Sequence, residues 1–421
     1  MRDMKDTGVA WIGAIPSKWP LVRFKDKYAN TKEIAKGRSV EFERLALTLN
    51  GVIKRPKDDS EGLQPKEFDG YQILRENDFV FKMIDLQNVS TSRVGLSTYT
   101  GLVSPAYIRF SPKKPNQYNQ FVYYYLMSLY YNCVYNNLGG NGVRSALNAK
   151  DMGEFLVPYP DEAEQRRICA FLDKKCTQVD TLIANVQTQI EKLKSYKQSL
   201  ITEVVTKGLD HTVPMKDSGV AWIGEIPAHW EIKRGKALFK ETEARSADGS
   251  EELLTVSQYT GITPRSQKNV TMFEALSLEG YKICEIGDIA ANTMWLWAGA
   301  IGVSEYRGVI SPSYNVYRQR GNDFIPRYLD HLLRAPMLVQ EYASLSTGIR
   351  ASRLRLYPKD FLNIHFPVPP LEEQQAILDA LSSKCSAVDR LISIKRAKIE
   401  KLEQYKRSLI YEYVTGKREV V

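Results

Sequence analysis

Two polar loops that contain glycine carry arginine residues at matching places. Residues 139–145 read Gly-Gly-Asn-Gly-Val-Arg-Ser, residues 346–353 read Ser-Thr-Gly-Ile-Arg-Ala-Ser-Arg, and Arg144 corresponds to Arg350. A guanidinium group makes paired hydrogen bonds to guanine edges and phosphate oxygens, so these loops suit contact with DNA. The alternative is a surface arginine paired with a nearby carboxylate. Neither loop has a G-x-x-x-x-G-K-[ST] or G-x-G-x-x-G pattern, so a nucleotide site is not indicated.

An aromatic segment stands between these loops. Residues 292–297 read Asn-Thr-Met-Trp-Leu-Trp and correspond to Phe81–Asn88 in the first half of the chain. Trp295 and Trp297 are able to wedge against a DNA groove, although the pattern favours an aromatic core.

The sequence contains no constellation for catalysis. It has no N-P-P-[FY] or D-P-P-[FY] motif for adenine methylation, no Walker motif and no G-x-S-x-G nucleophile elbow. Its five cysteines are odd in number and lack Cys-x-x-Cys spacing, and there are four histidines, so neither a disulfide scaffold nor a zinc site is indicated. We therefore interpret the chain as a binding protein without a metal site and not as an enzyme.

Charge and composition are those of a globular protein, and the positive charge suits either an anionic partner such as nucleic acid or a mildly basic surface without a partner. The chain has 421 residues, 43% of them hydrophobic, and a net charge of +9. Residues 1–160 carry 22 basic against 16 acidic side chains, while residues 209–369 are balanced at 18 each, with arginine as 11 of the 18 basic residues. No apolar run reaches the ~20 residues of a membrane span, and the N-terminus lacks a signal-peptide core, so we expect a cytoplasmic protein.

The chain is a tandem duplication. Residues 4–16 return as residues 215–227 with two differences, and Trp19 returns as Trp230. Residues 164–206 align without gaps on residues 373–415, with 22 of 43 positions identical. The segments between these repeats have diverged far more. The sequence therefore indicates two lobes with different binding specificities, each followed by a copy of one repeated helical segment, which we call the rod.

Each copy ends in a long helical pattern with an apolar seam at steps of four and three residues. This is the 3.5-residue period of a coiled coil. The seam comprises Leu172, Val179, Ile183, Ile190, Leu193 and Leu200 in the first copy, and Leu381, Val388, Ile392, Ile399, Leu402 and Leu409 in the second. A helix of roughly 65 Å is too long for one lobe to cover, so the two seams should pair with each other, in an antiparallel or a parallel arrangement.

Residues at the starts of the two predicted helices and lysines within the seam also fit this prediction. Asp161 is placed to cap the first, and Pro370 suits the first turn of the second. The lysines within the seam, Lys197, Lys395 and Lys406, either select the register or extend to the edge of the interface, and the second interpretation is favoured.

Outside the long helices, the sequence pattern predicts lobes rich in β-strands. Gly70–Val80 matches Gly280–Ala290 as a strand, a tight turn and a second strand. Helices are expected at about Gln120–Tyr131 and Pro326–Tyr342. The tryptophans of the opening segments, residues 4–19 and 215–230, are expected to anchor each lobe to the rod.

The predicted fold class is α+β: two β-rich globular domains separated by two long helices that pair as an antiparallel coiled coil, a tandem repeat with pseudo-two-fold symmetry. The predicted divisions are residues 1–160 and 209–369 for the domains and residues 161–208 and 370–421 for the helices.

The whole chain resembles the specificity (S) subunits of type I restriction-modification systems. The resemblance rests on Gly-Val-Ala-Trp-Ile-Gly-x-Ile-Pro at 8–16 and 219–227, Ser-Pro-x-Tyr at 104 and 311, and Val-Pro-Pro-Leu-Glu-Glu-Gln at 368–374. It implies two target recognition domains that read the halves of a gapped DNA site, with the helices as a ruler between half-sites about 34 Å apart. It further implies two modification subunits that carry S-adenosylmethionine and methylate adenine at N6, and two restriction subunits with ATP and Mg²⁺; no cofactor is expected in this chain.

Because the two lobes differ in sequence, we predict two unequal half-sites. The side chains expected to contact DNA are Asn88, Ser90, Arg93, Asn141, Arg144 and Ser145 in the first lobe, and Asn292, Trp295, Arg350, Ser352 and Arg353 in the second. The alternatives are a stand-alone bivalent DNA-binding protein without enzymatic partners and a coiled-coil adaptor that binds proteins alone.

Overall fold

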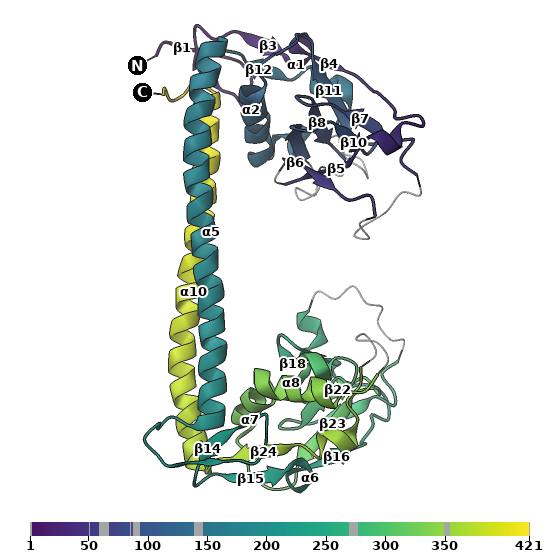
Figure 1. Ribbon diagram of the computed structural model, residues 1–421, viewed down its shortest axis with the longest axis vertical. Helices are drawn as coiled ribbons and strands as arrows, with labels where there is room; N and C mark the ends of the chain where they lie inside the picture. The colour runs from purple at the N-terminus through teal and green to yellow at the C-terminus, as the bar shows by residue number, and fades with distance from the viewer. Residues whose placement is uncertain are drawn as a thin grey trace. The chain divides into compact units, whose positions relative to one another are not determined.

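A computed structural model describes residues 2–49, 51–58, 67–84, 86, 93–138, 146–268, 277–348 and 354–420. The chain forms two compact units, the first of Met1–Gln187 with Arg396–Val421 and the second of Thr188–Lys395. Each unit contains one β-rich lobe and a stretch of both long helices (Figure 1). The division by residue number expected from the sequence stays a prediction.

The lobe of the first unit is built on two four-stranded sheets. One has the order β6 (Gly51–Arg55), β5 (Arg44–Thr48), β10 (Gly101–Val103) and β7 (Gln72–Leu74), and the other β4 (Tyr28–Asn30), β11 (Ile108–Pro112), β8 (Phe79–Lys82) and β9 (Arg93–Leu96). Two strand pairs, β1 (Met4–Asp6) with β2 (Ala14–Pro16) and β3 (Leu21–Arg23) with β12 (Leu156–Pro158), flank them. The helical elements are α1 (Phe24–Lys27), η1 (Ser39–Glu41), α2 (Gln120–Tyr131), α3 (Val134–Leu138) and α4 (Ala149–Gly153).

The second lobe repeats this plan. Its four-stranded sheet has the order β16 (Phe239–Thr242), β23 (Asn315–Gln319), β20 (Ile289–Ala291) and β21 (Ile301–Val303). The pairs are β17 (Leu254–Ser257) with β18 (Gly261–Pro264), β19 (Lys282–Cys284) with β22 (Gly308–Ile310), β13 (Met215–Asp217) with β14 (Glu225–Pro227), and β15 (Glu231–Arg234) with β24 (His365–Val368). The helical elements are α6 (Gly235–Leu238), η2 (Arg265–Gln267), η3 (Leu296–Ala298), α7 (Pro326–Leu333), α8 (Pro336–Leu345) and α9 (Pro358–Phe361).

Each lobe contains a parallel contact between strands at the same place in its strand order. In the first lobe β5 and β10 run parallel, with Leu102 opposite Arg44. In the second lobe the bridge between Leu253 and Val309 is also parallel and joins the β17–β18 pair to the β19–β22 pair. The second lobe therefore reproduces the strand order β6-β5-β10-β7 as β18-β17-β22-β19.

The predicted strand, tight turn and second strand are confirmed in both lobes, as β7 and β8 in the first and as β19 and β20 in the second, and the two strands of each segment belong to different sheets. One expectation about local structure is corrected. The helix expected at Pro326–Tyr342 is two helices, because Ala335 precedes Pro336 and takes an extended conformation, with a ψ of 134°. The helix at Gln120–Tyr131 has the predicted bounds.

The long helices are α5 (Glu162–Lys207) and α10 (Leu371–Val414). In the first unit, the Phe171 ring near the start of α5 lies 4.5 Å from the Tyr413 ring near the end of α10. In the second unit, Lys197 Nζ on α5 lies 2.7 Å from Asp389 Oδ2 on α10. Within both units the helices are antiparallel, as the drawing shows (Figure 1), and the parallel alternative is wrong.

The predicted seam lies between the helices. Leu172, Val179, Ile190, Leu200, Leu381, Val388, Ile392 and Leu409 are buried, and Ile183, Leu193, Ile399 and Leu402 are half-buried. The seam lysines reach across to the other helix: Lys197 pairs with Asp389, Lys406 with Asp180, and Lys395 donates to Gln189 Oε1 at 2.6 Å. The carboxylates that Lys197 and Lys406 reach are exposed, so the ammonium groups lie at the edge of the interface, and a part in selecting the register stays a prediction.

The opening segments clasp the helix ends in the same way in both units. Trp19 Nε1 donates to Glu164 Oε2 at 2.8 Å in the first turn of α5, and Trp230 Nε1 donates to Glu373 Oε2 at 2.9 Å in the first turn of α10. Both indoles are buried, so the predicted anchoring by Trp19 and Trp230 is confirmed. The backbone that follows each helix passes close by: a Cβ on Gly416, whose φ is +68°, would lie 2.4 Å from the Pro16 ring.

Candidate DNA interface

Described residues beside the two first-lobe segments that carry the predicted DNA contacts lie close together near the end of β8. Lys82 at the end of β8 pairs with Arg93 at the start of β9, and two residues further on Ile84 forms an antiparallel bridge with Ala146. The Asn136 side chain donates to the carbonyl of Leu86. Asn88, Ser90, Asn141, Arg144 and Ser145, and the side chain of Arg93, lie outside the described residues. Residues adjacent to both first-lobe segments therefore meet near the end of β8, and we call such a place a root of DNA-reading segments.

In the second lobe, Asn292 occupies the corresponding position after β20. Its side chain is buried, Nδ2 donates to Tyr314 Oη at 2.9 Å, and Oδ1 accepts from the Met294 amide at 3.2 Å. Because both polar atoms are engaged, the amide fixes the shape of the turn at residues 292–295. A contact between this side chain and DNA stays a prediction and requires these bonds to open.

Trp295 stands on that turn with half of its surface exposed, at 50%. Its ring stacks on Trp297, with the centroids 5.7 Å apart and the planes at 26°, and Trp297 Nε1 donates to the Met294 carbonyl at 2.9 Å. The interpretation of Trp295 as an aromatic core residue is therefore wrong. An exposed indole face held by a second ring is a surface on which a nucleic-acid base or sugar can stack.

Helix α8 connects this turn to the second candidate loop. The turn that contains η3 packs against α8 so closely that a Cβ on Gly299 would lie 3.1 Å from Val339. Beyond α8, Thr347 and Arg355 exchange two backbone hydrogen bonds of 3.0 Å and close the loop between them. Arg350, Ser352 and Arg353 belong to this loop and lie outside the described residues.

The Ser-Pro-x-Tyr motifs form turns that support the candidate interface. In both, the tyrosine amide donates to the serine carbonyl, at 3.1 Å for Tyr107 and 2.9 Å for Tyr314. The Tyr314 hydroxyl then accepts the hydrogen bond from Asn292, so this motif holds the turn that presents Trp295.

Two equivalent ion pairs, which the sequence analysis did not single out, connect strands of the same sheets, and both include a buried aspartate. Arg109 on β11 lies 2.5 Å from Asp78, and its equivalent Arg318 on β23 lies 2.7 Å from Asp288. Each aspartate also accepts a backbone N–H from its own turn, at 2.8 and 2.9 Å. The Asp288 carboxylate raises the pKa of Arg318. The sequence signal that could have identified these ion pairs is the matching position of the two aspartates. Asp78 immediately precedes β8, and Asp288 immediately precedes β20.

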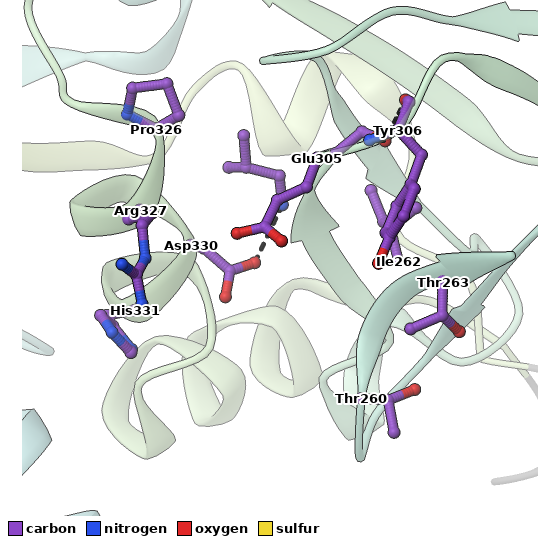
Figure 2. Close-up of a pocket in the computed structure, with 11 residues that line it drawn as sticks. Thr260, Ile262, Thr263, Glu305, Tyr306, Pro326, Arg327, Asp330 and His331 are labelled. Carbon is purple, nitrogen blue, oxygen red and sulfur yellow. Dashed lines mark hydrogen bonds between the residues drawn. The ribbon is translucent and has the colours of Figure 1, made fainter. Parts of the chain in front are cut away.

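The second lobe also has a cavity of about 250 Å³ between β18, β21 and α7. Figure 2 shows the carboxylates of Glu305 and Asp330 pointing toward each other there, and Asp330 Oδ1 accepts from the Val303 amide at 2.9 Å. Arg327 and His331 line the cavity too, and burial lowers the pKa of His331. Paired carboxylates disfavour a phosphate, so we assign this cavity no part in DNA binding.

Among the described residues, no group of three His, Cys, Asp or Glu side chains is placed to hold a metal ion. No helix in the described ranges is long and apolar enough to cross a membrane.

Residues 25–194 and 228–404 each match the family model of the type I restriction modification DNA specificity domain. The chain belongs to this family. It is 26% identical over 425 residues to the type I restriction enzyme MjaVIII specificity subunit of Methanocaldococcus jannaschii, an alignment that covers 96% of this chain and 93% of the relative. It is 23% identical to the Escherichia coli EcoBI specificity subunit, over 69% of this chain and 64% of the relative.

A solved chain from work on complex assembly and conformational transition of the type I restriction-modification system has the same fold. The TM-score is 0.66 at 15% identity, over 96% of this chain and 99% of that one. The two specificity domains are the two lobes with the adjoining stretches of helix. The chain is accordingly a non-catalytic DNA-recognition protein of the type I restriction-modification system.

Proposed function

We propose that this chain is the specificity subunit of a type I restriction-modification complex and that it reads a gapped, asymmetric DNA site. The observation that carries the proposal is the occurrence of two specificity domains in one chain, at residues 25–194 and 228–404. Each domain has its own root for DNA-reading segments, after β8 in one and after β20 in the other. Two roots in one chain correspond to two half-sites.

The half-sites are unequal because the reading segments differ. The first lobe roots two segments at the Ile84–Ala146 bridge, whereas the second presents an exposed indole on a turn held by Asn292. We expect α5 and α10 to set the gap between the half-sites. Helices of 46 and 44 residues, at 1.5 Å per residue, extend about 65–70 Å and exceed one turn of DNA.

The chemistry of the complex belongs to partner subunits. We propose two modification subunits, which bind S-adenosylmethionine and methylate adenine at N6, and two restriction subunits, which use ATP and Mg²⁺. The target adenine must leave the stack to be methylated, and lobes that hold the flanking bases help to meet that cost. The proposed location is the cytoplasm, where these subunits meet DNA.

Single-molecule sequencing of genomic DNA tests the proposal. N6-methyladenine is mapped in cells with the gene intact, deleted, and restored from a plasmid. We expect one gapped, two-part motif to lose methylation on deletion and regain it on restoration. An unchanged methylome in cells that express the modification subunit would overturn the proposal and favour a stand-alone bivalent DNA-binding protein.

A further inference from the structure

Each long helix begins with a buried glutamine at an equivalent position, Gln165 in α5 and Gln374 in α10. Their exposed fractions are 2% and 0%. In both, Nε2 donates to the carbonyl of the proline five residues earlier, at 2.8 Å to Pro160 and 2.9 Å to Pro369. The first contact of the side-chain amide is therefore the same in both units.

The remaining contacts of the amide differ between the units. In the second unit, Gln374 holds a backbone segment of its own lobe: Oε1 accepts the Ile325 N–H at 2.9 Å, and Nε2 also donates to the Asp323 carbonyl at 2.8 Å. In the first unit, no described group donates to Gln165 Oε1, although this atom is buried. Because buried acceptors in folded proteins almost always have a donor, the oxygen of Gln165 calls for a partner.

The length of the segment that follows the lobe strand explains the difference. The segment between β23 and α7 comprises residues 320–325, whereas the segment between β11 and α2 comprises residues 113–119 and is longer by one residue. Asn119 precedes α2 as Ile325 precedes α7, but its side chain is held by the Tyr28 hydroxyl, which donates to Asn119 Oδ1 at 2.9 Å. The longer segment therefore does not close on the glutamine of its helix.

A cavity of about 580 Å³ lies in the first unit between this longer segment and the start of α5. Gln165 lines it together with residues 114–118. The volume is within the range of ~300–1,000 Å³ that is typical of ligand pockets. The first unit thus has room for an occupant beside the glutamine.

The charge of the cavity wall indicates an anionic occupant. Three lysines line the cavity without an ion pair to a described carboxylate: Lys18, Lys27 and Lys114. The carboxylates of the wall are already engaged, Asp161 with the Glu164 amide, Glu162 with Arg166, and Glu164 with Trp19. The charge left for an occupant is therefore positive.

We propose that this cavity binds an extended, acidic peptide segment of a partner protein. Its backbone N–H takes the position at Gln165 Oε1 that the Ile325 N–H takes at Gln374, and a carbonyl two residues earlier takes the position of the Asp323 carbonyl. A carboxylate of the segment meets the lysines. The inference goes beyond the proposed function and is independent of the DNA site.

Entry of the segment requires Tyr159 to move. Burial raises the pKa of the Tyr159 hydroxyl, and the neighbouring Gln165 amide acts in the opposite direction. This side chain therefore lies beside the amide, and an occupant that takes both positions of the amide turns the Tyr159 ring aside.

The chain should bind one such segment and not two. The amide of Gln374 is already satisfied by its own lobe, so the equivalent place in the second unit is taken. A segment bound once would distinguish the two ends of the repeated helices.

The test uses the segment of the second lobe as its probe, because this segment already fits a glutamine in this position. A peptide with the sequence of residues 321–326, Gly-Asn-Asp-Phe-Ile-Pro, is capped at both ends, labelled with a fluorophore and titrated with the full-length chain. Anisotropy gives the affinity, and isothermal titration calorimetry gives the number of peptides bound. Two altered peptides are matched controls: one has N-methylisoleucine, which lacks the N–H, and one has asparagine in place of aspartate.

Three variants of the chain complete the test. Q165M removes the amide and keeps a side chain of similar length. K114E reverses one charge of the cavity wall, and K113E is its control, because Lys113 is exposed in the same segment but does not line the cavity. The altered peptides and K114E decide the question even if Q165M does not fold.

We expect one peptide bound per chain. Affinity should fall at least tenfold for the N-methyl peptide and for Q165M, because each change leaves a buried polar group unpaired. It should fall several-fold for the asparagine peptide and for K114E, with a loss that shrinks as salt is raised, and K113E should bind as the wild type does.

Four results would overturn the inference. These are no saturable binding of the peptide up to about 1 mM, two peptides bound per chain, equal affinity for the N-methyl peptide, and tighter binding of adenosine monophosphate that Q165M abolishes. The last would assign the cavity to an adenine nucleotide, whose base offers glutamine the same pair of hydrogen bonds. None of these results bears on the reading of a gapped DNA site, so the proposed function stands or falls separately.

Discussion

Trp19 and Trp230 make the same contacts at the two clasps between opening segment and helix, each with a glutamate in the first helical turn. The ends of β8 and β20 are also equivalent in the strand order, yet the chain beyond them differs. After β8 the next described contact is a bridge to Ala146, and after β20 the chain turns back on itself through Asn292.

This comparison distinguishes two sets of contacts: those shared by both domains, which we call the shared frame, and those particular to one lobe. Contacts that join lobe to helix and helix to helix are shared by both domains, so a change there should affect both half-sites equally. Contacts beyond β8 and β20 are particular to one lobe, so a change there should affect one half-site. Each of the following predictions tests whether a residue belongs to the shared frame or to one lobe.

The largest effects should come from the clasps. Replacement of Trp19 or Trp230 by alanine removes a buried indole and its hydrogen bond, and we expect a loss of about 4–5 kcal/mol in the free energy of unfolding for each. Denaturant unfolding of W19A and W230A measures it, with W19F and W230F as controls that keep most of the packing and should lose less. Costs that differ by more than about 1 kcal/mol between the two alanine variants would break the equivalence of the clasps.

The two ion pairs with buried aspartates should show how two equivalent contacts diverge. Arg109 is 5% exposed and its replacement by methionine leaves the Asp78 carboxylate buried without its partner, which should cost about 3–4 kcal/mol. Arg318 is 44% exposed beside Asp288, so water can replace it and R318M should cost about 1–2 kcal/mol. Thermal unfolding of both variants is the measurement. Equal losses would show that burial of the arginine does not govern the strength of the pair.

The contacts of the shared frame were predictable because the residues that make them occur in both copies of the repeat. The seam period, the cap at Asp161 and the tryptophans of the opening segments all follow from spacing and residue type, and the structure places them accordingly. The direction of the helix pair followed less directly, since an apolar seam suits both directions and the contacts of Lys197 and Lys406 were needed to decide.

The candidate interface was less predictable because its parts are distant in sequence. Asn292 was expected to contact DNA, but its amide donates a hydrogen bond to Tyr314. The pattern favoured a core position for Trp295, but its side chain is half exposed. Local composition does not reveal which partner a polar side chain finds across a lobe. Equally, the pairing of Ile84 with Ala146 depends on strand order, which the sequence pattern left open.

An intermediate effect should come from the exposed indole, and it should be confined to one half-site. We expect W295A to weaken binding by about 1–3 kcal/mol, the range for loss of a stacking contact. Competition with oligonucleotides altered in one half-site at a time should show that the variant no longer distinguishes changes in the half-site read by the second lobe. Y357A is the control, because Tyr357 is a similarly exposed aromatic residue of the same lobe. Equal losses on unrelated DNA would assign Trp295 to general affinity.

The smallest effects should come from the interhelical ion pairs. K197A and K406A should each cost about 0.5–1 kcal/mol, because both pairs are partly exposed and side-chain entropy offsets most of the attraction. A double-mutant cycle with D389A or D180A isolates each pair, and the coupling should shrink as salt is raised. The exchanged pair K197D/D389K should recover part of the loss. Because the two pairs are related by the duplication, equal coupling would assign them to the shared frame, whereas coupling at one pair alone would mean that the helices, like the lobes, have begun to differ in function.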